Sequence, residues 1–114
     1  VPETRYYVAA DEEGSIVGYA GMMSVGAEAD VQTIAVHPDL RRSGLGQRLL
    51  DDLIERARLR GCTRLFLEVA SDNDVAQQLY VQSGFDTIAR RSNYYAPGVD
   101  ALVMRLVIDG RREQ

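Results

Sequence analysis

The chain has 114 residues, of which 46% are hydrophobic and 26% are charged. This length suits one domain, and this composition is that of an ordinary soluble globule, not of a disordered, collagen-like or disulfide-rich chain. The formal net charge of −4 is unfavourable for contact with the phosphate backbone of nucleic acids, so direct binding to nucleic acid is a weak hypothesis.

Cysteine content and the length of apolar runs limit the possible cellular compartment and the kinds of site the chain can form. Cys62 is the only cysteine, which excludes an intramolecular disulfide and a cysteine-based metal cage. No run approaches the ~18–20 apolar residues of a membrane span, and the first residues show no signal-peptide pattern. We therefore predict a cytoplasmic protein with no membrane partner and no metal site. Because a strand pattern follows Val1 almost at once, we also expect that residues upstream have been removed.

The first third of the chain reads as three strands. Residues 5–10 and 15–23 are rich in β-branched and aromatic side chains and are separated by turn residues, which predicts a β-hairpin. Gly18 and Gly21 inside the second strand suit a bulge or a close backbone neighbour. A third strand is predicted over residues 31–36, ahead of a proline that cannot donate to a ladder.

The middle of the chain reads as a strand–helix–strand unit. Apolar residues recur every four positions and predict a helix that ends near Gly61: Leu45, Leu49, Leu53 and Ala57. Residues 64–70 are nearly all apolar, which is typical of a strand covered on both faces. Residues 31–70 are therefore predicted to form a βαβ unit.

The last third predicts one short helix and two strands. A helix is expected over residues 75–80, before Gly84. Strands are expected over residues 85–90 and 101–108, on either side of an aromatic loop at 94–98. Residues beyond 108 read as a polar tail.

A glycine-punctuated loop opens the long helix. Gly44 and Gly46 lack the Cβ atoms that would block close approach, so successive backbone N–H groups could converge there on an anion. Two rival phosphate motifs fail: residue 49 is leucine where G-x-G-x-x-G needs glycine, and the loop has no Walker A lysine. A turn that uses glycine only for its positive φ remains the alternative.

The pattern Arg41-x-x-Gly44-x-Gly46 after Val36-His37-Pro38 resembles the acetyl-CoA pyrophosphate loop of the GNAT superfamily of N-acetyltransferases. Further matching residues resemble the branch that acetylates the N-terminal alanine of a small-subunit ribosomal protein: Leu67-Glu68-Val69, Asn73, Leu79-Tyr80, Ser83-Gly84-Phe85 and residues 90–95. The resemblance covers roughly residues 5–108.

The resemblance also implies the fold. We expect one GNAT domain over residues 1–114, of the mixed α/β (α+β) acyl-CoA N-acyltransferase class. Its twisted, mostly antiparallel sheet would have about six strands with a splayed central pair and flanking helices. Family members carry an N-terminal strand and helices that wall part of the acceptor site, and this chain has no residues for them.

The resemblance implies acetyl-CoA as the cofactor. Backbone N–H groups of residues 42–47 would hold the pyrophosphate, with help from Arg41 or Arg42. The strand over residues 32–36 would lie along the pantetheine arm, and one of its N–H groups would stabilise the oxyanion. The expected cofactor-binding residues are Ile34, Ala35, Val36, Arg41, Arg42, Ser43, Gly44, Leu45, Gly46, Gln47 and Asn73, of which Asn73 also reads as an N-cap.

Two residues are candidates for proton transfer. Glu68 is the one charge in residues 65–70. The resemblance implies a general base, whereas the residue alone suggests a salt-bridged or rim carboxylate. The resemblance implies that Tyr80 protonates the leaving thiolate, although such a tyrosine is often an ordinary core residue. His37 stands at a strand end, and we assign it no catalytic role.

Tyr94 and Tyr95 are the candidates for contact with the acceptor, because the matching loop overhangs the acceptor peptide in the family. The alternative is that the two rings pack under their own loop.

The function implied is acetyl transfer from acetyl-CoA to the α-amine of a protein N-terminus, a ribosomal protein's alanine, by direct attack in a ternary complex. Two alternatives stay open: an acetyltransferase for lysine or a small amine, and a CoA-binding module without catalysis. The oligomeric state is left open.

Overall fold

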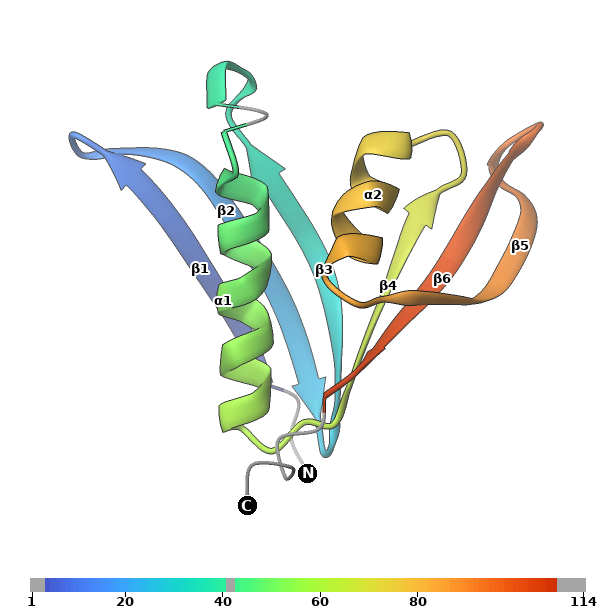
Figure 1. Cartoon of the computed structure of the whole chain (residues 1–114), viewed down its shortest axis with the longest axis horizontal. Helices are drawn as coiled ribbons and strands as arrows, with labels where there is room; N and C mark the ends of the chain where they lie inside the picture. Colours follow the sequence, from blue (N-terminus) through green and yellow to red (C-terminus); the bar gives the residue numbers. More distant parts are fainter. Residues whose placement is uncertain (1–3, 41–42, 109–114) are drawn as a thin grey trace.

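The computed structural model describes residues 4–40 and 43–108, with the side chains of residues 4–12 excepted. Within these residues, three strands are followed by a short 3-10 helix and an α-helix, then by a strand, a second α-helix and two more strands. Figure 1 shows these elements in chain order. The elements are β1 (Thr4–Glu12), β2 (Ser15–Val25), β3 (Glu28–Val36), η1 (Pro38–Leu40), α1 (Leu45–Leu59), β4 (Arg64–Ala70), α2 (Asp74–Gln82), β5 (Asp86–Ala96) and β6 (Val99–Val107).

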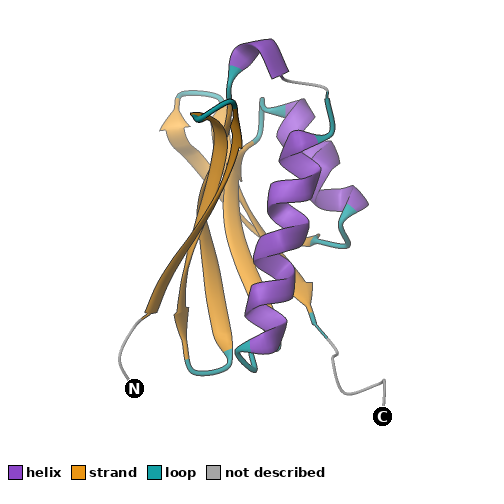
Figure 2. Cartoon of the chain, turned by 90° about the vertical axis from the view of Figure 1, so that its left-hand side faces the viewer, coloured by secondary structure: helices purple, strands orange, loops and turns teal. Residues whose placement is uncertain are grey.

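The described strands form one six-stranded sheet in the order β1-β2-β3-β4-β6-β5. Neighbouring strands are antiparallel except for the central pair β3 and β4, which is parallel because α1 crosses between them. Both helices lie on the same face of this sheet (Figure 2). The mixed, mostly antiparallel fold expected from the sequence is therefore confirmed.

The central pair separates almost as soon as it forms. The register of β3 and β4 covers three residue pairs and stops at Asp30 with Phe66. On its other side, β3 carries a bulge: Gly21 pairs with Thr33 but Met22 pairs with Val31, so Gln32 is one extra residue. An extra residue bends a strand and increases its twist, which turns β3 away from β4. Figure 1 shows the two halves of the sheet diverging beyond this point.

The main core lies between the sheet and α1. All four residues of the predicted helical stripe are buried, and they pack against β2 and β4 side chains such as Met22 and Leu65. Gly18 allows this close approach, because a Cβ there would lie 3.1 Å from the Ala35 carbonyl oxygen and from Leu45 and Leu49 side-chain atoms. Within the described ranges, no helix is long and apolar enough to cross a membrane.

Two expectations about the C-terminal half were wrong. β4 is buried on one face only, since α1 and α2 share that face; Glu68 on the opposite face is exposed. The aromatic segment is not a loop, because β5 continues through Ala96, which pairs with Val99. Tyr94 and Tyr95 are consequently strand residues near a tight turn.

Candidate active site

A cleft of about 360 Å³ opens where β3 and β4 part. Because the strands no longer pair beyond Asp30 and Phe66, the facing backbone edges of both strands are free to bond a ligand there. The lining comes from β3, β4, α2 with its N-cap, and β5: Val31, Gln32, Thr33, Ile34, Glu68, Val69, Ala70, Asn73, Ala76, Tyr80 and Tyr95. Five of the predicted site residues thus meet in one cleft: Ile34, Glu68, Asn73, Tyr80 and Tyr95.

The cleft is lined from both faces of the sheet. Tyr80 and Asn73 belong to the helix side, whereas Glu68 alternates with the buried Leu67 and Val69 and therefore lies on the opposite face. A proton donor and a proton acceptor can accordingly reach the same opening from opposite sides.

Glu68 stands at the rim of the cleft and is ion-paired. Its Oε2 lies 3.5 Å from Nη1 of Arg91, and 33% of its side chain is exposed. The guanidinium of Arg91 also lies over the Tyr94 ring, 5.4 Å from the centroid. The salt-bridged reading of Glu68 is therefore correct as geometry, and the carboxylate remains accessible to a water or an amine.

Tyr80 offers a protonated phenol from α2. Its ring meets Phe85 edge-on, with 5.9 Å between centroids, which fixes the ring while the residue stays half-buried at the cleft. Burial raises the pKa of Tyr80, so its hydroxyl keeps its proton at neutral pH. Such a group is suited to donate a proton and not to accept one.

Asn73 is the N-cap of α2 and also lies at the cleft. Its Oδ1 accepts the Ala76 N–H at 3.1 Å as the N-cap of α2, and the residue also lines the cleft. The cap holds the first turn of α2, and with it Ala76, against the opening.

The first turn of α1 does not contribute to the lining of the cleft. Gly44 is the N-cap with φ +86° and provides no side-chain cap to the helix. The Gln47 side chain turns to α2, where Nε2 donates to Ser83 Oγ at 2.7 Å. Arg41 and Arg42 lie outside the described residues. Ala35 and Val36 pair with β2 and do not line the cleft.

The two glycines at the start of α1 have different surroundings. A Cβ at Gly46 would meet Leu79 and Val36 side-chain atoms at 3.7 and 3.8 Å, which is ordinary contact. At Gly44 the same atom would project into open space, from a backbone conformation that favours glycine. Gly44, not Gly46, is therefore the glycine that the loop geometry requires.

The two tyrosines of β5 have separate places. Their rings form an edge-to-face pair with centroids 5.3 Å apart, and each residue is about half exposed. Tyr95 lines the cleft, and burial followed by the charge of Glu68 raises its pKa. Tyr94 packs against Arg91 instead, so the structure brings one of the pair to the opening.

Two charged residues near the cleft were missed. Arg91 reaches Glu68 because β6 lies between β4 and β5, an order that strand patterns do not reveal. Asp30 ends the β3–β4 pairing, and its pKa is raised by burial, then by the charges of Glu28 and Glu68. Asp30 was missed because the third strand was predicted to begin one residue later, at Val31.

The chain is similar to proteins of a known family. The model of the acetyltransferase (GNAT) family matches residues 1–85. The N-alpha-acetyltransferase RimI of Mycobacterium tuberculosis is 42% identical over 106 residues, which cover 89% of this chain and 65% of that protein. The chain therefore spans just under two thirds of this curated relative.

Solved structures of acetyltransferases match the fold of this chain. The ribosomal-protein-S18-alanine N-acetyltransferase of Escherichia coli matches with a TM-score of 0.87 and 36% identity, covering 92% of this chain and 70% of that one. The structure of yncA from Salmonella typhimurium, solved with its cofactor acetyl-CoA, matches with a TM-score of 0.81 and 26% identity, covering 90% of this chain and 64% of that one.

The raised pKa of Asp30 predicts a pH-dependent effect on stability. Asp30→Asn should raise the melting temperature at neutral pH, because the charged form of Asp30 is disfavoured in the folded state. The gain should shrink as the pH falls through the raised folded-state pKa and vanish below the ordinary aspartate pKa of about 3.9, where Asp30 is neutral in both states. Thermal melts across this range measure it, with the exposed Asp52→Asn as the control. A gain that does not change with pH would contradict this electrostatic account.

Proposed function

The chain belongs to the acetyltransferase (GNAT) family, and from this premise we propose that it transfers the acetyl group of acetyl-CoA to the α-amine of a protein N-terminus. The observation that carries the proposal is the meeting of Glu68, Tyr80 and the unpaired backbone of β3 in one cleft. The names of the relatives favour an N-terminal alanine of a ribosomal protein as the acceptor. Such an acceptor would place the reaction in the cytoplasm.

The donor would bind on the helix side. The N-cap Gly44 gives α1 no side-chain cap, and the positive end of the helix dipole would face the pyrophosphate together with the N–H groups of Ser43 to Gln47. Of these, the Ser43 N–H would leave the Leu40 carbonyl and the Leu45 N–H would leave Ser43 Oγ. Arg41 and Arg42 precede them in the sequence. The β3 backbone from Ile34 to Val36 would bond the amides of the pantetheine arm, and Asn73 would contact the same arm. A β3 N–H would stabilise negative charge that develops on the acetyl oxygen.

The proton transfers follow from the two sides of the cleft. Glu68 takes a proton from the incoming ammonium, through water, and the free amine forms its bond to the acetyl carbon. As the carbon–sulfur bond breaks, the Tyr80 hydroxyl gives its proton to the departing thiolate. The phenolate then takes, through water, the second proton that the attacking nitrogen must lose, so that a neutral amide and the CoA thiol are released. An acyl-enzyme is not needed, and Cys62 is buried away from the cleft lining. Tyr95, with Tyr94 beside it, forms the wall on the acceptor side.

Acetyl transfer to paired peptides tests the proposal. One peptide begins with alanine and contains one lysine, and its matched control has the same sequence with a blocked N-terminus. Mass spectrometry should find one acetyl group on the α-amine of the first peptide and none on the second. Acetylation of the lysine alone would replace the proposed acceptor, and CoA binding with no product would make the chain a binding module.

The glycine pair at the two ends of α1 tests the donor loop. Gly44 and Gly61 share a φ of +86° and open space around a would-be Cβ. Gly44→Ala and Gly61→Ala should each cost about 1–2 kcal/mol of stability, since both force alanine into the left-handed region. Calorimetry should find acetyl-CoA affinity lowered at least about tenfold in Gly44→Ala only, because a methyl group there crowds the anion. Equal affinities in both variants would refute the loop assignment.

Glu68 and Arg91 separate a general base from a structural ion pair. Glu68→Gln removes the base and the ion pair, whereas Arg91→Gln removes the ion pair and the contact with the Tyr94 ring but keeps the carboxylate. We expect kcat to fall about a hundredfold in Glu68→Gln, the usual scale for a lost general base, and to stay within a few-fold in Arg91→Gln. Equal losses of kcat in both variants would show that Glu68 acts only through its ion pair.

A further inference from the structure

The tyrosines beside the cleft are not held by the strand ladder. β5 is an edge strand, and its register with β6 breaks between Arg91 and Ala96. Residues 92–95, which include Tyr94 and Tyr95, therefore have no partner on β6 in the described register. All of β5 is exposed, so burial of its own side chains does not fix this segment either.

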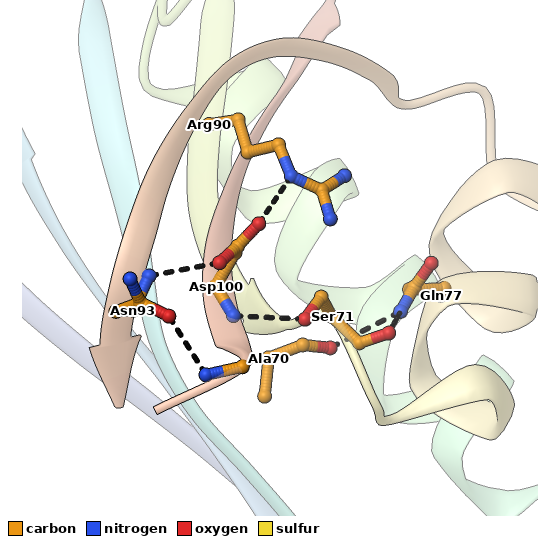
Figure 3. A network of polar contacts seen from close by, with 7 residues as sticks. Ala70, Ser71, Gln77, Arg90, Asn93 and Asp100 are labelled. Atoms are coloured by element: carbon orange, nitrogen blue, oxygen red, sulfur yellow. Dashed lines mark hydrogen bonds and ion pairs between the residues drawn. The ribbon is translucent and has the colours of Figure 1, made fainter. Parts of the chain in front are cut away.

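One carboxylate holds the interrupted segment instead. Asp100 Oδ1 accepts the Asn93 N–H at 2.8 Å, and Oδ2 accepts a hydrogen bond from Arg90 Nε (Figure 3). Asn93 has a φ of +54°, which an asparagine adopts at some cost, and its Oδ1 accepts the Gly98 N–H at 2.7 Å. The bend is thus closed by side chains on both strands of the hairpin.

The same residue ties the hairpin to the cleft. The Asp100 N–H donates to Ser71 Oγ at 2.8 Å, and its carbonyl accepts the Ser71 N–H at 2.9 Å. Gln77 of α2 in turn donates from Nε2 to the carbonyls of Ala70 and Ser71 at 3.1 Å each. Ser71 lies between two cleft-lining residues, Ala70 and Asn73.

The Asp100 side chain is charged and enclosed. It is 16% exposed, and the hydrogen bond from the Asn93 N–H, followed by that from Arg90, lowers its pKa. The anionic carboxylate therefore persists at neutral pH, with each oxygen engaged by a donor. A neutral amide of the same shape could not accept from both donors.

We propose that Asp100 is a positioning residue for the acceptor side of the site. Its carboxylate holds residues 92–95 in the bend that places Tyr95 against the cleft and Tyr94 under Arg91, the partner of Glu68. The consequence for catalysis rests on the proposed function, because it requires an acceptor that enters past these tyrosines. Acetyl-CoA binding on the helix side should not depend on Asp100.

Asp100→Asn, in β6, tests this role, with Asp86→Asn at the exposed start of the neighbouring strand β5 as the control. Loss of one charge-assisted hydrogen bond should raise the acceptor KM about tenfold, with kcat changed less than KM and acetyl-CoA affinity within about twofold. Hydrogen exchange at the Asn93 amide should also quicken about tenfold in this variant only. An unchanged acceptor KM, or an equal loss of acetyl-CoA binding, would overturn the role.

A second measurement uses the unaltered protein, so it does not depend on the variant's folding. The NMR shift of the Asn93 amide should follow the titration of the Asp100 carboxyl, with a midpoint below the ordinary aspartate range, whereas the Ser92 amide should not. If the NMR shift of the Asn93 amide does not change as the Asp100 carboxyl titrates, the contact between them is refuted. If the unaltered protein acetylates no peptide, the proposed function fails separately, and Asn93 exchange and titration still decide whether Asp100 holds the bend.

Discussion

The site depends on the separation of β3 from β4 after three residue pairs. A parallel pair in the middle of a sheet would normally satisfy its backbone groups along its whole length and leave no room for a ligand. The extra residue at Gln32 bends β3 while its pairing with β2 continues, so the sheet opens without losing its core. The opening then exposes backbone donors and acceptors of β3 beside side chains from β4, α2 and β5.

Charge is distributed unequally across this opening. On the face away from the helices, Glu68 and Asp30 are acidic, and Arg91 neutralises part of that charge. On the helix side, Tyr80 is a neutral phenol, and burial raises its pKa further above neutral pH. An ammonium group is favoured on the acidic face, and an anionic leaving group meets a proton donor on the other. The fold thereby keeps the acid and the base apart at one cleft.

Local sequence patterns were enough to predict both helices and most of the extent of the strands. The four-residue repeat from Leu45 to Ala57 predicted α1 and its buried stripe, and Asn73 announced the start of α2. Contacts between distant strands were not predictable in this way. The Arg91–Glu68 ion pair depends on the order β4-β6-β5, and the fixed bend at Asn93 depends on the register that brings Asp100 beside it. The extension of β5 through the tyrosines was missed because Pro97 and Gly98 suggested a longer loop than the two-residue turn that forms.

The central claim is that the gap between β3 and β4 receives the donor, and mapping backbone amides by NMR during titration with acetyl-CoA tests it most directly. We expect the largest shifts at residues 31–36 of β3 and 44–47 at the start of α1, two separate elements that would hold the pantetheine arm and the pyrophosphate, with smaller shifts at Asn73 and Tyr80. Shifts confined to the outer surface of α2, around Gln78 and Gln82, or an absence of shifts at β3, would contradict it.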